Sequence, residues 1–168
     1  GFPNWNKLVE QILNHLNEEH PSDSSPINFP YYINALKSGS KNVLDILEVI
    51  DNGGYKKEVK TMLYEIINGI DYEGKDLTNQ KKLWEISDKI ITTNYDKVLD
   101  ETTPKGIEVF SNDNPFQQVQ SIKGKPFLYK IHGDITNPNT CILFKSDYED
   151  LYKGDKSNTQ TLRNFILK

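Results

Sequence analysis

Apolar residues in the first half of the chain recur at helical spacing. Behind Asn4, a candidate N-cap, apolar positions three and four apart predict a first helix that ends near residue 20. Residues 21–77 continue in this way and predict a module of three helices. The first two begin near Pro30 and Ser40, and the third carries an apolar stripe from Val59 to Ile67 and stops at Gly69. Such stripes indicate packing against a core rather than a ligand site.

After residue 78 the pattern changes to short apolar runs separated by helical segments. Helices are expected from Thr78 through Ile86, at 95–101, after Ser146 and at 159–168. Four runs read as strands, namely 89–93, 107–110, 126–131 and 140–144. Short strands that alternate with helices predict an α/β fold with a mostly parallel sheet flanked by helices.

Length and composition are those of one soluble globular domain. The chain has 168 residues, of which 36% are hydrophobic and 26% charged. No apolar run approaches the roughly 20 residues that span a bilayer, and no signal-peptide pattern is present, so we expect no membrane association and a cytoplasmic location.

Charge and cysteine content exclude two classes of site. The net charge of −4 offers no electrostatic footprint for nucleic acid. Cys141 is the only cysteine, which rules out an internal disulfide and a zinc site built from thiolates of this chain, and no metal is expected.

Polar clusters follow two of the predicted strands. Asn94 and Asp96 come after the run at 89–93, and the sequence His132-Gly133-Asp134 comes after the run at 126–131. Ligands of open parallel sheets bind outside the carboxyl ends of the strands, so these clusters are expected to face one crevice. Gly133 would then let a ligand approach the backbone.

Each cluster also has a purely structural interpretation. Asn94 and Asp96 are residues that cap helices, and the segment after them is predicted to be helical. His132-Gly133-Asp134 is also compatible with an ordinary turn. The occurrence of both clusters at the ends of successive apolar strands favours a ligand site.

These residues resemble a known family. The sequence "TTNYD" at 92–96, followed by "LYKIHGD" at 128–134, is similar to the sirtuin pattern of a Thr-x-Asn-x-Asp turn and a later His-Gly. "CILFKSDYEDLY" at 141–152 resembles the bacterial sirtuin-like branch associated with antiphage defence. The resemblance implies a Rossmann-like domain, composed of residues 1–20 and 78–168, with the helical module of 21–77 inserted after the first helix.

The resemblance also implies roles for individual residues. His132 and Asn94 match the catalytic histidine and asparagine of enzymes that cleave the nicotinamide–ribose bond of NAD. Thr92, Thr93, Asp96 and Gly133 match positions that bind NAD, which is a substrate here rather than a resident cofactor. Thr93 stands where protein deacylases usually carry Gln.

The resemblance favours one activity within the family. Sirtuin deacylases carry two CxxC pairs after the His-Gly, and only Cys141 follows it here. We therefore expect hydrolysis of NAD, with water as the acceptor. The alternatives are an NAD-dependent protein deacylase and a non-catalytic nucleotide-binding or sensing module.

One motif of the family is not found. The sequence contains no G-x-G-x-x-G turn of the kind that cradles a pyrophosphate at a helix N-terminus. This leads to the expectation that the 168 residues are a fragment of an incomplete fold, weakly stable and nearly inactive in isolation, and that homo-oligomerisation uses regions outside it.

Overall fold

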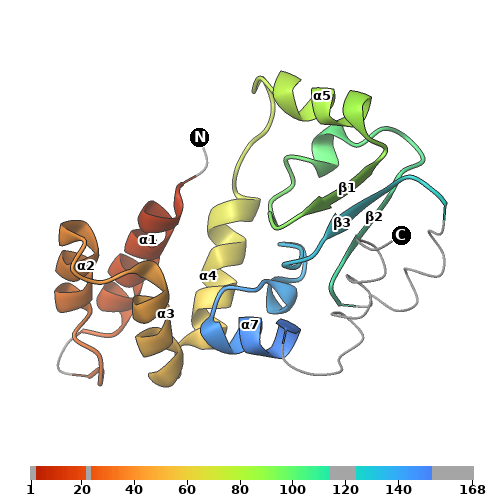
Figure 1. The fold of residues 1–168 in the computed structure, drawn as a ribbon. Helices are drawn as coiled ribbons and strands as arrows, with labels where there is room; N and C mark the ends of the chain where they lie inside the picture. Colours follow the sequence, from red (N-terminus) through yellow and green to blue (C-terminus); the bar gives the residue numbers. More distant parts are fainter. Residues whose placement is uncertain (1–2, 22–23, 114–123, 153–168) are drawn as a thin grey trace.

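The computed structural model describes residues 3–21, 24–113 and 124–152. Four helices make up the first half, in the order α1 (Trp5–Glu19), α2 (Phe29–Ser38), α3 (Val43–Asn52) and α4 (Lys56–Asn68). Figure 1 shows α4 standing between the other three helices and the sheet. The helices predicted in the first half are therefore present, and α4 is the one that lies next to the sheet-bearing half. Their grouping as a separate module stays a prediction.

Asparagine residues begin three of these helices. The side chains of Asn4, Asn28 and Asn42 each accept a hydrogen bond from the backbone N–H three residues later. These bonds satisfy N–H groups that have no partner inside the helix. Gly39 ends α2 with a φ of 70°, a conformation that costs other residues more.

The second half forms a small parallel sheet. Helix α5 (Thr78–Ile86) leads into β1 (Lys89–Thr92), which is followed by the 3-10 turn η1 (Asp100–Thr102), β2 (Glu108–Ser111), β3 (Phe127–Lys130), the 3-10 turn η2 (Pro138–Thr140) and α7 (Lys145–Tyr152). The strand order is β1-β3-β2, and both pairs are parallel. The chain thus has the predicted α/β, Rossmann-like layout, with a parallel sheet flanked by helices.

Two local predictions are wrong. Residues 140–144 form no strand, because the N–H groups of Leu143 and Phe144 bond to the Asp147 carboxylate rather than to a neighbouring strand. The helix expected at 95–101 is reduced to η1. The helix expected at 159–168 lies outside the described residues.

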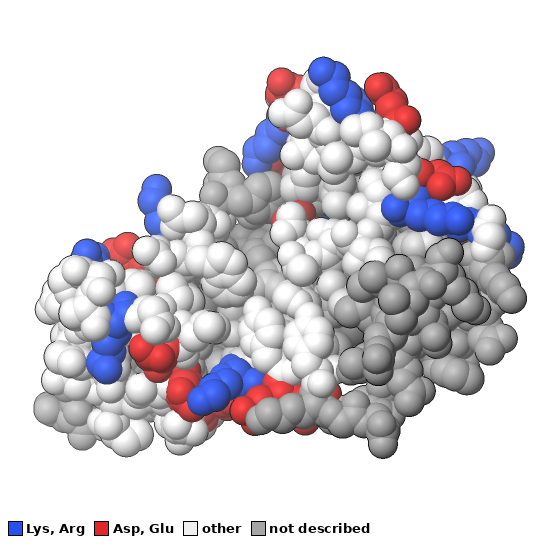
Figure 2. All heavy atoms as spheres, in the orientation of Figure 1, with Lys and Arg blue, Asp and Glu red and all other residues white. Residues whose placement is uncertain are grey.

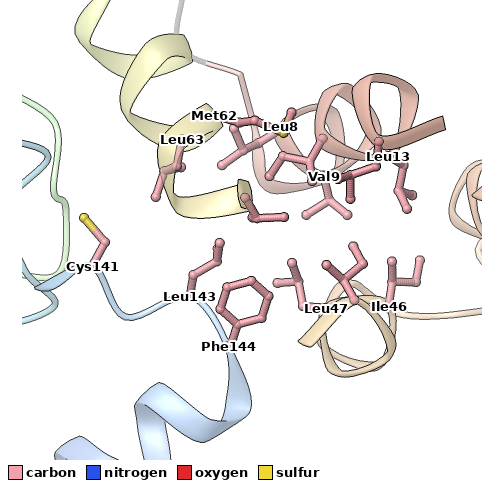
Figure 3. Packing of buried hydrophobic residues seen from close by; sticks show 14 of the residues in the cluster. Leu8, Val9, Leu13, Ile46, Leu47, Met62, Leu63, Cys141, Leu143 and Phe144 are labelled. Atoms are coloured by element: carbon pink, nitrogen blue, oxygen red, sulfur yellow. The ribbon is translucent and has the colours of Figure 1, made fainter. Parts of the chain in front are cut away.

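The main core joins the two halves of the chain. Buried side chains of α1, α3 and α4 pack with Cys141, Leu143 and Phe144 from the segment before α7 (Figure 3). Helix α1 thus packs on the helices of 21–77. The assignment of residues 1–20 to a Rossmann-like part stays a prediction.

The sheet half leaves some apolar groups exposed. Ile91 on β1 is 40% exposed, Ile86 on α5 is 81% exposed, and no residue of α5 is buried. Within the described residues, no helix has the length and apolar character needed to cross a membrane. On the face seen in Figure 2, acidic and basic side chains are interspersed around the rim, and the area between the two halves is largely uncharged.

Candidate functional site

The two polar clusters lie at the ends of neighbouring strands. Strands β1 and β3 pair in parallel with Thr92 opposite Lys130, and the Ile131 N–H donates to the Thr92 carbonyl. Asn94 and His132 each follow two residues after this pair. Both line one cavity of about 890 Å³. The structure therefore brings together the two residues that the sequence selected.

The cavity has an apolar side and a polar side. Its apolar lining comes from α1, α4, α5 and β1 and includes Trp5, Leu8, Ile67, Leu83, Ile90 and Ile91. Its polar lining includes Thr92, Thr93, Asn94, Asp96, His132 and Tyr148. Five of the six predicted site residues thus face the same space, the exception being Gly133. Concave sites of this mixed character are typical of small-molecule binding.

The turn after β1 holds Asn94 with its side chain free. The Asn94 backbone N–H donates to Thr92 Oγ1 at 3.1 Å, and the side chain, which is exposed, makes no hydrogen bond within the described residues. Asp96 behaves differently, because its Oδ1 accepts the Val98 N–H at 2.9 Å. The capping interpretation fits neither residue, because η1 follows Leu99 without a side-chain cap. Asp96 instead closes a turn with Val98, whereas Asn94 is available to a ligand.

Burial affects the acidic group of this turn. Desolvation raises the pKa of Asp96, although the bond from Val98 and the nearby charge of Lys130 oppose that effect.

The turn after β1 is bonded to the loop that carries His132, since the Ile135 N–H donates to the Tyr95 carbonyl at 2.9 Å.

His132 is held by both its backbone and its ring. Its carbonyl accepts the Ile142 N–H at 2.8 Å, and its Nε2 lies 2.9 Å from the Tyr152 hydroxyl. Burial lowers the pKa of the imidazole from its ordinary value of about 6.5. The ring is therefore mostly neutral at pH 7, the form that accepts a proton.

Gly133 is required by packing. Its φ is 98°, and a Cβ at this position would overlap the carbonyl oxygen of Thr140. The open side of this glycine thus faces the backbone of residues 140–141, and Gly133 is not part of the cavity lining. Its assignment to NAD binding stays a prediction, and the close approach it permits is to the chain itself.

Gly133→Ala should therefore destabilise the protein and disturb His132. We expect a loss of at least about 2 kcal/mol in the free energy of unfolding, because strain at positive φ adds to a backbone clash. Gly39→Ala is the matched control: it also has a positive φ, but nothing lies within 4 Å of its added Cβ. Equal losses in both variants, measured by denaturant unfolding, would contradict the steric argument.

A buried ion cluster beneath the two loops was missed by the sequence analysis. Lys130 is fully buried, and its Nζ lies 2.7 Å from Asp134 and 3.0 Å from Asp100. Lys130 thereby joins η1, which follows the Asn94 turn, to the loop that carries His132. The sequence signal was a lysine inside an apolar strand, a position where an unpaired charge is costly.

Neither thiol chemistry at Cys141 nor metal binding is supported in the described part of the site. Burial raises the pKa of the Cys141 thiol to about 12, so it is protonated and a poor nucleophile or ligand. Residues 3–21, 24–113 and 124–152 contain no group of three His, Cys, Asp or Glu side chains placed to hold a metal ion.

Comparisons with known proteins agree with the motifs. Residues 88–168 match the family model of the SIR2-like domain. The chain is 24% identical over 162 residues to the NAD(+) hydrolase ThsA of Bacillus cereus (strain MSX-D12), an alignment that takes in 89% of this chain. It spans only 28% of the length of that relative. The resemblance to sirtuin-like domains is thereby confirmed.

Proposed function

We propose that this sirtuin-like domain binds NAD with the nicotinamide riboside between Asn94 and His132, and that the complete protein hydrolyses NAD. The observation that carries the proposal is the position of these two side chains at adjacent ends of parallel strands on one cavity. The name of the relative, an NAD(+) hydrolase, supports the choice of substrate.

The reaction makes demands that these residues meet. Breaking the bond between the ribose C1′ and the pyridinium nitrogen sends the electron pair to nicotinamide and leaves oxocarbenium character on the ribose. Water then forms the new C1′–O bond and loses a proton, which gives ADP-ribose. The enzyme must hold the sugar and the water in place as this charge develops.

Five polar groups of the cavity have a role in this scheme. Neutral His132 accepts a proton from a ribose hydroxyl or from the water. The free amide of Asn94 orients the same hydroxyl or the water without adding charge. Asp96 binds near the nicotinamide carboxamide, and the hydroxyls of Thr92 and Thr93 contact the ribose.

The residues of this chain favour water, rather than an acyl-lysine, as the acceptor of the ADP-ribosyl group. A deacylase of this family would need a zinc module to shape its acyl-lysine groove, and the lone Cys141 is buried in the core. A non-catalytic binding module is the other alternative. The free side chain of Asn94 and the neutral His132 in one cavity favour catalysis.

The biological setting is inferred from the resemblance. The motifs at 92–96, 128–134 and 141–152 favour a role in bacterial antiphage defence, in which depletion of NAD is the output. We further infer that the protein acts in the cytoplasm as a homo-oligomer without direct contact to nucleic acid.

Asn94→Ala tests the proposal. We expect the rate of nicotinamide release from NAD by the complete protein to fall about a hundredfold, because one positioned polar group at the reacting centre is lost. Asn14→Ala, on the exposed side of α1, is the control and should keep the wild-type rate. Product analysis should show ADP-ribose with or without an acetyl-lysine peptide.

Three results would reject parts of the proposal. An unchanged rate in Asn94→Ala would remove this residue from catalysis. Acetylated ADP-ribose in the presence of the peptide would favour the deacylase. NAD binding without any turnover would favour the non-catalytic module.

A further inference from the structure

The ring of His132 is enclosed by two tyrosines of α7. Tyr152 places its hydroxyl 2.9 Å from Nε2, and the Tyr148 ring meets the imidazole edge-on, with centroids 5.4 Å apart. The two phenol rings are themselves stacked, at an interplanar angle of 18°. Residues four apart lie on the same face of a helix, so α7 presents both rings to His132 together.

Helix α7 is anchored firmly enough to fix these rings. The buried carboxylate of Asp147 accepts the N–H groups of Leu143 and Phe144, and it pairs with Lys56 at 2.7 Å and Lys60 at 3.2 Å. Both lysines belong to α4. The tyrosines thus approach the cavity from a helix that is bound to the core of the molecule.

The position of the Tyr152 hydroxyl limits how His132 can act. A neutral imidazole carries one N–H and one free lone pair, and the hydrogen bond made by one nitrogen decides which is which. If the phenol donated to Nε2, the proton would sit on Nδ1 and both nitrogens would be occupied. A general base needs a free lone pair, so only the opposite arrangement is compatible with catalysis.

We propose that Tyr152 is a positioning residue whose hydroxyl accepts a hydrogen bond from Nε2–H of His132, so that Nδ1 is the nitrogen that takes the proton. This inference rests on the proposed function for its catalytic meaning. Within the described residues, Nδ1 makes no hydrogen bond, and His132 lines the cavity. The phenol oxygen continues to accept from Nε2–H after Nδ1 is protonated, and it steadies the imidazolium.

The charge state of the surroundings agrees with this role. The titratable groups that contact the His132 ring in the described structure are the phenols of Tyr148 and Tyr152, both from α7. Burial raises the pKa of each phenol, so both are neutral across the physiological range. A neutral acceptor orients the ring without the large rise in the histidine pKa that a carboxylate would cause.

The test is the tautomer of His132 in the complete protein labelled with ¹⁵N-histidine. The sequence has only three histidines, so the His132 signals can be assigned with His132→Gln. We expect the wild-type ring to be protonated on Nε2 and Tyr152→Phe to shift it toward a mixture. Tyr148→Phe should retain the wild-type tautomer, because Tyr148 meets the imidazole edge-on and, within the described residues, makes no hydrogen bond to either ring nitrogen.

Kinetics supply the second readout. We expect Tyr152→Phe to lower kcat/KM for NAD on the order of tenfold. Removing the acceptor disfavours the imidazolium, so the acid limb of the pH profile should move to lower pH. Tyr31→Phe, at an exposed position of α2, makes the same chemical change outside the site and should keep the wild-type rate and profile.

Two results would overturn the inference: a wild-type ring protonated on Nδ1, or an unchanged tautomer in Tyr152→Phe. A tautomer that shifts as expected in a protein that does not cleave NAD would instead reject the proposed function and leave the hydrogen bond established.

Discussion

His132→Ala should reduce hydrolysis of NAD by the complete protein by roughly 10²- to 10⁴-fold, the range that a general base contributes. The substitution removes the one imidazole of the cavity lining, and the phenols of Tyr148 and Tyr152 are too weakly basic to replace it. Nicotinamide release under saturating NAD, followed by chromatography, measures the effect.

The variant should fold, which makes the loss interpretable. The hydrogen bond that fixes the loop runs from the Ile142 N–H to the His132 carbonyl, and this backbone contact survives the change of side chain. His15→Ala on α1 is the control, because His15 is not part of the cavity lining and should keep the wild-type rate. A loss of less than about threefold in His132→Ala, with wild-type thermal unfolding, would exclude His132 as the base.

The pH dependence has a definite sign. Because burial lowers the pKa of His132, the fraction of neutral imidazole stays high below the ordinary value of about 6.5. The acid limb of the wild-type pH profile should therefore lie below that ordinary value, where the ring becomes protonated. A rate that already halves at pH 7 would contradict a buried, neutral base.

The sequence predicted correctly those helices whose signals lie within a single segment of the chain. Helices α1 to α4 follow from apolar stripes and from Asn or Gly at their ends, and these signals are complete within each segment. The neighbourhood of Asn94 and His132 was also predictable, because parallel strands must end at the same edge of a sheet.

Tertiary contacts decide what the sequence analysis missed. The run 140–144 is apolar because it fills the core beneath α4, and a carboxylate later in the chain, Asp147, takes two of its N–H groups. An apolar run indicates that a segment is buried, but it does not indicate which hydrogen-bond acceptors its backbone N–H groups contact. Gly133 was selected for the approach of a ligand, which stays a prediction, and the close approach in the structure is to Thr140, a contact that no sequence pattern indicates.

The ion cluster of Lys130 gives the second large effect that we expect. Lys130→Met keeps the length and apolar stem of the side chain but leaves Asp100 and Asp134 without their shared cation. Breaking a buried pair by removing one partner costs about 3 to 5 kcal/mol, so the free energy of unfolding should fall by about that amount. NAD hydrolysis should fall too, since the cluster joins the Asn94 and His132 loops.

At acid pH, Lys130→Met and the wild type should differ less in their free energy of unfolding. The direction of this change follows from the pKa of Asp134. Burial alone would raise the pKa of that carboxyl, but hydrogen bonds from Lys130 and Thr136 outweigh it and hold the pKa below the ordinary value. The stabilisation is therefore present above the pKa of the unfolded chain, about 3.9, and is lost as the pH falls through the lower pKa of the folded state. The variant and the wild type should differ most near pH 7 and converge once the pH falls below the folded-state pKa of Asp134.

A surface pair provides the comparison that makes this prediction specific. Lys37→Met removes the 2.9 Å contact to Glu10 between α2 and α1, where the lysine side chain is 56% exposed. Exposed pairs contribute at most about 1 kcal/mol, so this variant should unfold almost like the wild type. If Lys130→Met were equally mild, solvent rather than Lys130 would be satisfying the two carboxylates. The Asn94 and His132 loops would then owe their alignment to the strand pairing and to backbone bonds such as that from the Ile135 N–H to the Tyr95 carbonyl.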